Sequence, residues 1–94
     1  MRELAVNEQE FCELAKASGF SQPERLSREA NLFNAEHTHE FDVEAFIVEG
    51  ELSVTTADGV TVCKSGDRFS LARDIPHEER YGPDGAEILV AKRL

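Results

Sequence analysis

Residues 31–50 read NLFNAEHTHEFDVEAFIVEG, and residues 66–77 read GDRFSLARDIPH. In these segments and in the rest of the C-terminal two thirds, apolar residues alternate with polar ones or form short runs. Between them lie predicted turns rich in glycine, aspartate and proline, among them Glu49-Gly50 and residues 82–85. The clearest runs are Phe41 to Val48, Leu52 to Thr56, Val60 to Cys63, Phe69 to Leu71 and Ala86 to Ala91. Such alternation is typical of half-buried β-strands. Short strands at regular spacing predict an all-β barrel or sandwich.

The three histidines carry the most chemical information. His37 and His39 lie two residues apart at the entrance to the first predicted strand, so we expect both side chains on one face. Imidazole nitrogens bind Zn, Fe, Ni, Cu or Mn, and a site with one more ligand keeps coordination positions open. His77 is the only other histidine. If His37 and His39 are considered without their context, two exposed side chains on an edge strand are a simpler interpretation than a metal site.

In this context, the two quoted segments resemble the two motifs of the cupin superfamily, in particular its small, single-domain, cupin-2-like proteins. Three residues of the first motif and two of the second match; these are His37, His39 and Gly50, then Gly66 and His77. The resemblance implies a double-stranded β-helix (jelly-roll) barrel. It also implies a divalent transition metal (Zn, Fe, Mn, Ni or Cu) bound by His37, His39 and His77.

The chain departs from these motifs at four positions. Asn31 and Asp74 stand where glycine is usual, Ala72 stands in place of proline, and Tyr81 in place of asparagine. Asparagine and aspartate tolerate a left-handed backbone, so the first two departures are compatible with the same turns.

The first motif also contains a glutamate, and its position in this chain is ambiguous. Counting forward from His39 gives Glu44, whereas counting back from Gly50 gives Val43. Strand parity from His39 continues through Val43, so Glu44 faces outward unless a β-bulge shifts the register. Either Glu44 is a fourth ligand, or Val43 leaves that position empty.

Other polar residues near the motifs have two interpretations each. Tyr81 has the parity of the third histidine, and its hydroxyl is either a donor or general acid in the pocket or part of the core. Glu78 or Glu79 either orients an imidazole or belongs to a solvated face. Arg68 and Arg73 either receive an anionic substrate or form surface ion pairs.

Residues 7–18 predict one short amphipathic helix, because apolar residues recur there at helical spacing. These are Phe11, Leu14 and Ala15. Asn7 suits the N-cap, Val6 is placed to pack on Phe11, and Gly19 suits the left-handed position after the helix. Residues 20–35 show no clear period.

The chain has 94 residues, which predicts a single domain over 1–94, with the helix and a connection in 1–30 and the barrel in 31–94. Ten Lys and Arg against 19 Asp and Glu give a net charge of −9, which argues against nucleic acid or membrane partners. No apolar leader is present, so we expect a cytoplasmic protein. A core this small favours a homodimer. Cys12 and Cys63 are expected to be buried free thiols.

These observations lead to two functional hypotheses. The first is a small cupin with a divalent metal on its three histidines, acting on a small organic molecule as a dioxygenase or isomerase type of enzyme. The alternative is a non-enzymatic cupin that binds or senses a small molecule and needs no metal. An interaction protein with a vestigial site is a third, plainer interpretation. The sequence leaves open whether the protein is an enzyme.

Overall fold

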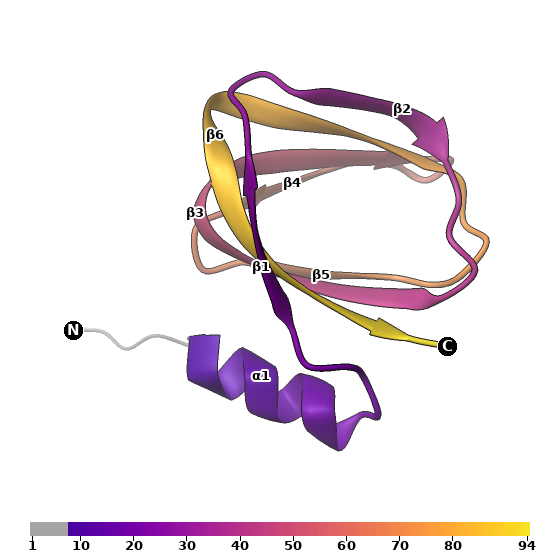
Figure 1. Cartoon of the computed structure of the whole chain (residues 1–94). Helices are drawn as coiled ribbons and strands as arrows, with labels where there is room; N and C mark the ends of the chain where they lie inside the picture. Colours follow the sequence, from indigo (N-terminus) through magenta and orange to yellow (C-terminus); the bar gives the residue numbers. More distant parts are fainter. Residues whose placement is uncertain (1–7) are drawn as a thin grey trace.

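The computed structural model describes residues 8–94. Within this part the chain forms one helix followed by antiparallel strands, as the sequence predicted (Figure 1). The elements are α1 (Glu8–Ala17), β1 (Glu24–Arg28), β2 (Phe33–His37), β3 (Asp42–Thr56), β4 (Gly59–Lys64), β5 (Arg68–Leu71) and β6 (His77–Arg93). The expected N-cap Asn7 and the staple residue Val6 lie outside the described residues.

Two long strands, β3 and β6, pair with each other and run through both layers of the barrel. The first half of β3 pairs with β5 and its second half with β4. Likewise, the first half of β6 pairs with β2 and its second half with β1. One layer is therefore β1-β6-β3-β5 and the other is β2-β6-β3-β4, which is the predicted jelly-roll arrangement.

Both long strands bend at one corner, where their register shifts between Ile47 and Leu52. Gly50 has a φ of +88°, and a Cβ built on it would lie 2.1 Å from the carbonyl oxygen of Gly85. The predicted turns at Glu49-Gly50 and at residues 82–85 were therefore wrong, because both segments lie inside continuous strands. Glycine here produces a bulge and a sharp bend, and the chain does not reverse.

Two strands lie in the segment for which the sequence showed no clear period. β1 pairs with the second half of β6, from Glu24 opposite Val90 to Arg28 opposite Ala86. The barrel therefore begins before residue 31, the boundary that we expected from the motifs. The sequence of β1 is ERLSR, and its single apolar residue, Leu26, is too little for an alternating pattern.

The two motif positions that lack glycine adopt the expected left-handed backbone. Asn31 has a φ of +59° and Asp74 a φ of +64°. This confirms that asparagine and aspartate replace glycine there without loss of the turn.

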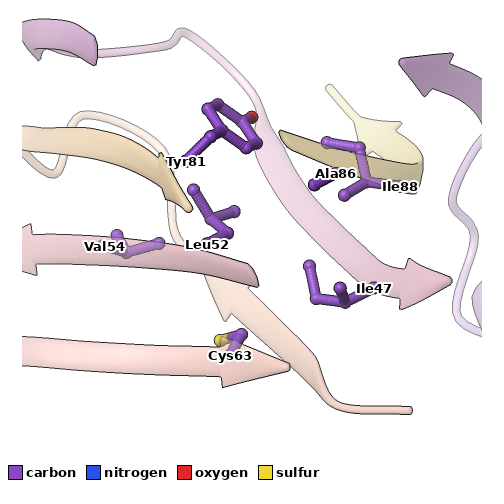
Figure 2. Packing of buried hydrophobic residues seen from close by; sticks show 7 residues of the cluster. All are labelled: Ile47, Leu52, Val54, Cys63, Tyr81, Ala86 and Ile88. Atoms are coloured by element: carbon purple, nitrogen blue, oxygen red, sulfur yellow. The ribbon is translucent and has the colours of Figure 1, made fainter. Parts of the chain in front are cut away.

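The main core fills the space between the two layers, and Figure 2 shows Leu52 beside Tyr81 in it. Ile47 and Leu52 are completely buried. Truncating such a residue to alanine typically costs about 2–5 kcal/mol. Cys63 belongs to this core and Cys12 is half-buried; both are free thiols.

The helix covers the outer surface of the layer that contains the first half of β3. Phe11 packs on Phe46 with 5.6 Å between ring centroids, and Leu89 completes this second cluster. Ala15 is buried, as its spacing predicted, but Leu14 remains 44% exposed. No helix in residues 8–94 has the length and apolar character that a membrane crossing needs.

The end of the helix is fastened to the last strand. Gly19 has a φ of +84°, and Phe20 N–H donates to the Ala15 carbonyl at 2.9 Å, which confirms the predicted left-handed helix end. Arg93 then donates one hydrogen bond to the Ser18 carbonyl at 2.9 Å and two to Asp42, at 2.9 and 3.3 Å. Asp42 thus links the C-terminal strand to the helix through Arg93.

Replacing Gly50 by alanine should destabilise the barrel by roughly 3 kcal/mol or more, because it adds a backbone clash to the left-handed strain. Gly59→Ala is the matched control, since Gly59 also has a positive φ, +121°, but a Cβ there meets nothing within 4 Å. We expect about 1 kcal/mol for the control. Thermal unfolding of both variants measures the difference, and equal losses would argue against the corner as a special constraint.

Stability should fall in acid as Asp42 is protonated. Hydrogen bonds from Arg73 and Arg93 lower the pKa of Asp42 from 3.8 to about 2. The contribution of Asp42 is therefore present above pH 4 and is lost as the pH falls from about 4 to 2. Urea unfolding across this range should show wild type and Asp42→Asn converging in stability, whereas Glu40→Gln, at an exposed position, should follow wild type throughout.

Candidate metal centre in the barrel

The structure brings the three predicted histidines together at the end of the barrel. His37 is the last residue of β2 and pairs in register with His77, the first residue of β6. Their ring centroids lie 4.3 Å apart, and His39 lies 4.9 Å from His37 and 5.1 Å from His77. One ligand nitrogen from each ring lies within 4.8 Å of the other two.

The reason for this convergence differs from the one that the sequence suggested. We expected His37 and His39 on one strand with a shared face, but β2 ends at His37, and His39 lies in the connection to β3. The cross-strand pairing of His37 with His77 brings two of the rings together. The connection then places the third ring beside them, stacked on Phe41 at 4.9 Å.

Backbone carbonyls determine which nitrogen of two histidines faces the site. Nδ1 of His37 lies 2.7 Å from the Ala35 carbonyl, and Nδ1 of His77 lies 2.9 Å from the Ile75 carbonyl. A carbonyl oxygen only accepts hydrogen bonds, so each Nδ1 carries the proton. In the neutral ring, Nε2 therefore presents its lone pair, which is the arrangement that orients histidine ligands in metal sites.

His77 is the most constrained of the three, with only 1% of its surface exposed. Its Nε2 is buried and has no hydrogen-bond partner among the described residues. Buried polar atoms are nearly always paired, and an unpaired one indicates a ligand or ion that completes the site. The donor set of three imidazoles fits a divalent first-row transition metal.

The pKa of His39 lies below its ordinary value of 6.5. The largest cause is partial burial, and the next is repulsion of its positive charge by His37 and His77. Both effects favour the neutral ring. His39 therefore also presents a free lone pair at neutral pH, which a metal ligand requires.

A pocket of about 230 Å³ extends from His37 and His39 into the barrel. The predicted strand parity holds here, since alternate residues along the chain face this pocket. Its walls include His39, Phe41, Val43 and Ala45 on one side and Leu26, Ile88 and Val90 on another. Val43, and not Glu44, thus occupies the inward position that the motif left ambiguous.

Glu44 faces the other side of β3, where it accepts hydrogen bonds from Arg68 at 3.2 Å and from Ser70. Arg73 likewise pairs with Asp42. Arg68 and Arg73 are therefore ion-pair partners on the outside of the barrel, which agrees with the interpretation that they form surface ion pairs and not with a role in binding an anionic substrate. A fourth ligand from Glu44 is not compatible with this orientation.

Three charged residues that line the pocket, Arg28, Glu79 and Lys92, were not assigned from the sequence. Glu79 lines the pocket with one carboxylate oxygen 3.5 Å from Nε2 of His77. Glu79 shares strand parity with His77, which favours an inward position, but the adjacent Glu78 and Glu79 were equally compatible with a solvated face. Arg28 lies on β1, so no pattern pointed to it.

Arg28 and Tyr81 form the inner polar group of the pocket. Arg28 and Tyr81 both line the pocket, and the charge of Arg28 acts on the Tyr81 side chain, which is 3% exposed. Burial and the nearby charge of Glu79 raise the pKa of Tyr81, so its hydroxyl stays protonated. Tyr81 therefore belongs to the core with its ring and to the pocket with its hydroxyl, which combines its two interpretations.

Comparison with known proteins gives matches among solved structures only. No protein-family model and no curated protein matches the chain. A protein from Neisseria meningitidis superposes with a TM-score of 0.65 at 25% identity, over 81% of this chain and 75% of its own. A cupin superfamily protein from Desulfitobacterium hafniense gives 0.68 at 18% identity, over 78% of this chain and 66% of its own.

Oxalate decarboxylase from Bacillus subtilis, a protein with Mn(II) centres, gives a TM-score of 0.66 at 22% identity. The match covers 73% of this chain but only 20% of the decarboxylase. These similarities concern the fold of the barrel.

We predict that Glu44→Gln changes the affinity of the histidine cluster for Zn²⁺ less than twofold, because the Glu44 carboxylate lies on the outer face. Competition with a chromophoric chelator measures this affinity. A loss of tenfold or more, the size expected when a ligand or its support is removed, would contradict the outward orientation.

Proposed function

Because this chain has the cupin fold, with three histidines converging at the end of its barrel, we propose that it binds one divalent transition metal through His37, His39 and His77. The observation that carries the proposal is the orientation of the rings. Two of them donate Nδ1–H to backbone carbonyls, which leaves Nε2 of the neutral ring with a free lone pair, and one nitrogen from each of the three rings lies within 4.8 Å of the other two. Three neutral ligands leave coordination positions open, which is typical of catalytic sites.

We further propose that the pocket next to this site receives a small organic substrate that carries oxygen. A bound metal would supply Lewis-acid polarisation of such an oxygen, or activation of water or dioxygen. The pocket itself, about 230 Å³ in volume, is smaller than a typical drug-sized site. Apolar side chains, among them Phe41 and Phe69, form much of its lining.

Arg28 and Tyr81 would bind the polar end of this substrate away from the metal. Arg28 is half-buried, and no carboxylate lies within 4 Å of it in the described part of the chain. In a chain of net charge −9, a half-buried cation without a carboxylate partner favours an anionic group on the substrate. The protonated Tyr81 hydroxyl offers a second hydrogen bond.

The same Arg28–Tyr81 pair favours one second candidate, a cupin that binds an anionic small molecule without a metal. In that case the histidines form part of the rim, and ligand affinity does not depend on a metal. The metal requirement therefore separates the two candidates.

The similarity to oxalate decarboxylase, whose centres contain Mn(II), makes Mn one of the metals to test first. Because this chain spans a fifth of that protein, its substrate is not transferred here. Zn, Fe, Ni and Cu remain in the test, since imidazole ligands suit all of them.

The first experiment is elemental analysis of protein purified without chelator or nickel affinity resin. We expect close to one first-row metal per chain, and its loss in both His37→Ala and His77→Ala. Circular dichroism should show unchanged β-structure in both variants, which checks that the barrel stays folded when the buried His77 ring is removed.

Adding the identified metal to apoprotein at a hundred times its dissociation constant should stabilise the fold by about 2.7 kcal/mol. Differential scanning calorimetry of wild type and of His77→Ala measures this stabilisation. Metal retained by either histidine variant would overturn the three-histidine site. Absence of metal together with no thermal shift would favour the second candidate.

A further inference from the structure

Glu79 lies against the buried nitrogen of His77 in an arrangement that lacks a positive charge. Nδ1 of His77 donates to the Ile75 carbonyl, so Nε2 of the neutral ring bears a lone pair. The nearest charged group to Nε2 is a Glu79 carboxylate oxygen, 3.5 Å away, and no hydrogen bond joins them. When the ring is neutral, Nε2 and the carboxylate oxygen both only accept hydrogen bonds, and a cation between them would pair with both.

The distance between the two atoms suits a shared metal ion. Around a tetrahedral ion with bonds of roughly 2.1 Å, two ligand atoms lie about 3.4 Å apart. The separation of Nε2 from the Glu79 carboxylate is 3.5 Å.

Several contacts hold the Glu79 carboxylate in this place. Glu79 follows His77 by two residues on β6, so strand alternation directs both side chains into the barrel. The Asn34 amide donates a hydrogen bond to its other oxygen at 3.0 Å. The side chain is only 16% exposed, and its negative charge has no Arg or Lys within 4 Å among the described residues.

From this geometry we infer that Glu79 is the fourth protein ligand of the metal, which makes the site three histidines and one carboxylate. The inference rests on the proposed metal site of His37, His39 and His77. Glu79 would supply the carboxylate that Glu44 cannot supply, from a different strand. The Asn34 amide would orient this ligand, as groups behind metal ligands commonly do.

Glu79→Gln tests the inference, because it keeps the shape and the hydrogen-bond acceptor for Asn34 but removes the charge. Glu78→Gln is the matched control, since Glu78 is the neighbouring residue and its parity places it on the other face of β6. We expect the affinity for Zn²⁺ and Mn²⁺ to fall at least tenfold in Glu79→Gln and to change less than twofold in Glu78→Gln.

Affinity alone does not separate a ligand from a residue that orients one, since both types of loss reach tenfold or more. The visible spectrum of Co²⁺-loaded protein separates them, because its band positions and intensities depend on the number and type of ligand atoms. We expect a changed spectrum in Glu79→Gln, a spectrum close to wild type in Asn34→Ala, and partial recovery of affinity in Glu79→Asp. Circular dichroism of each apoprotein checks that it is folded.

A wild-type Co²⁺ spectrum in folded Glu79→Gln, or unchanged affinity, would overturn the inference and leave the three-histidine site intact. If wild-type protein binds none of the metals, both proposals fail. These outcomes differ in the behaviour of the wild type, so failure of the ligand role and failure of the metal site are distinguishable.

Discussion

The close backbone contact between Gly50 and Gly85 is the constraint on which the barrel depends. At this point β3 and β6 cross from one layer to the other, and any side chain at residue 50 would overlap the Gly85 carbonyl. Because the two strands bend together, each contributes to both layers, and β1, β2, β4 and β5 need only extend their edges. A space between the layers follows directly, and the pocket and the histidines occupy its open end. The conformation of one glycine therefore determines where the pocket and the histidine cluster lie.

The path of β6 explains why the polar groups of the site occur in one continuous stretch. Before the bend, alternate residues of this strand face inward; these are His77, Glu79 and Tyr81. Glu79 and Tyr81 line the pocket together with Arg28, and the buried His77 lies with His37 and His39 at its end. After the bend the same strand supplies apolar wall residues, among them Ile88. One strand therefore provides a polar half and an apolar half of the same pocket.

The sequence predicted those parts of the fold that depend on residue type at a fixed spacing. Alternation identified the strands after His37, and the left-handed tolerance of Asn31 and Asp74 was correct. Prediction from the sequence failed where one residue type is compatible with two backbone structures. Gly50 was predicted to lie in a turn, because glycine permits both a chain reversal and a bulge. β1 was missed because it has little apolar surface to show a period. Arg28 was not predicted as a pocket residue for the same reason, because its position depends entirely on the pairing of β1 with β6.

The histidines could be named from the sequence, but their carboxylate partner could not, and the reason is electrostatic. Glu44 and Glu79 are the same residue type at equally plausible positions, and only their surroundings distinguish them. Glu44 faces a cation, since Arg68 lies 3.2 Å away, so its charge is already compensated by the protein. Glu79 faces the lone pair of a buried imidazole, and among the described residues its charge has no Arg or Lys within 4 Å. A metal ion would bind most favourably beside a largely buried carboxylate whose charge no protein cation compensates. Charge compensation, rather than agreement with a motif, is therefore the basis on which we propose Glu79 as the carboxylate ligand.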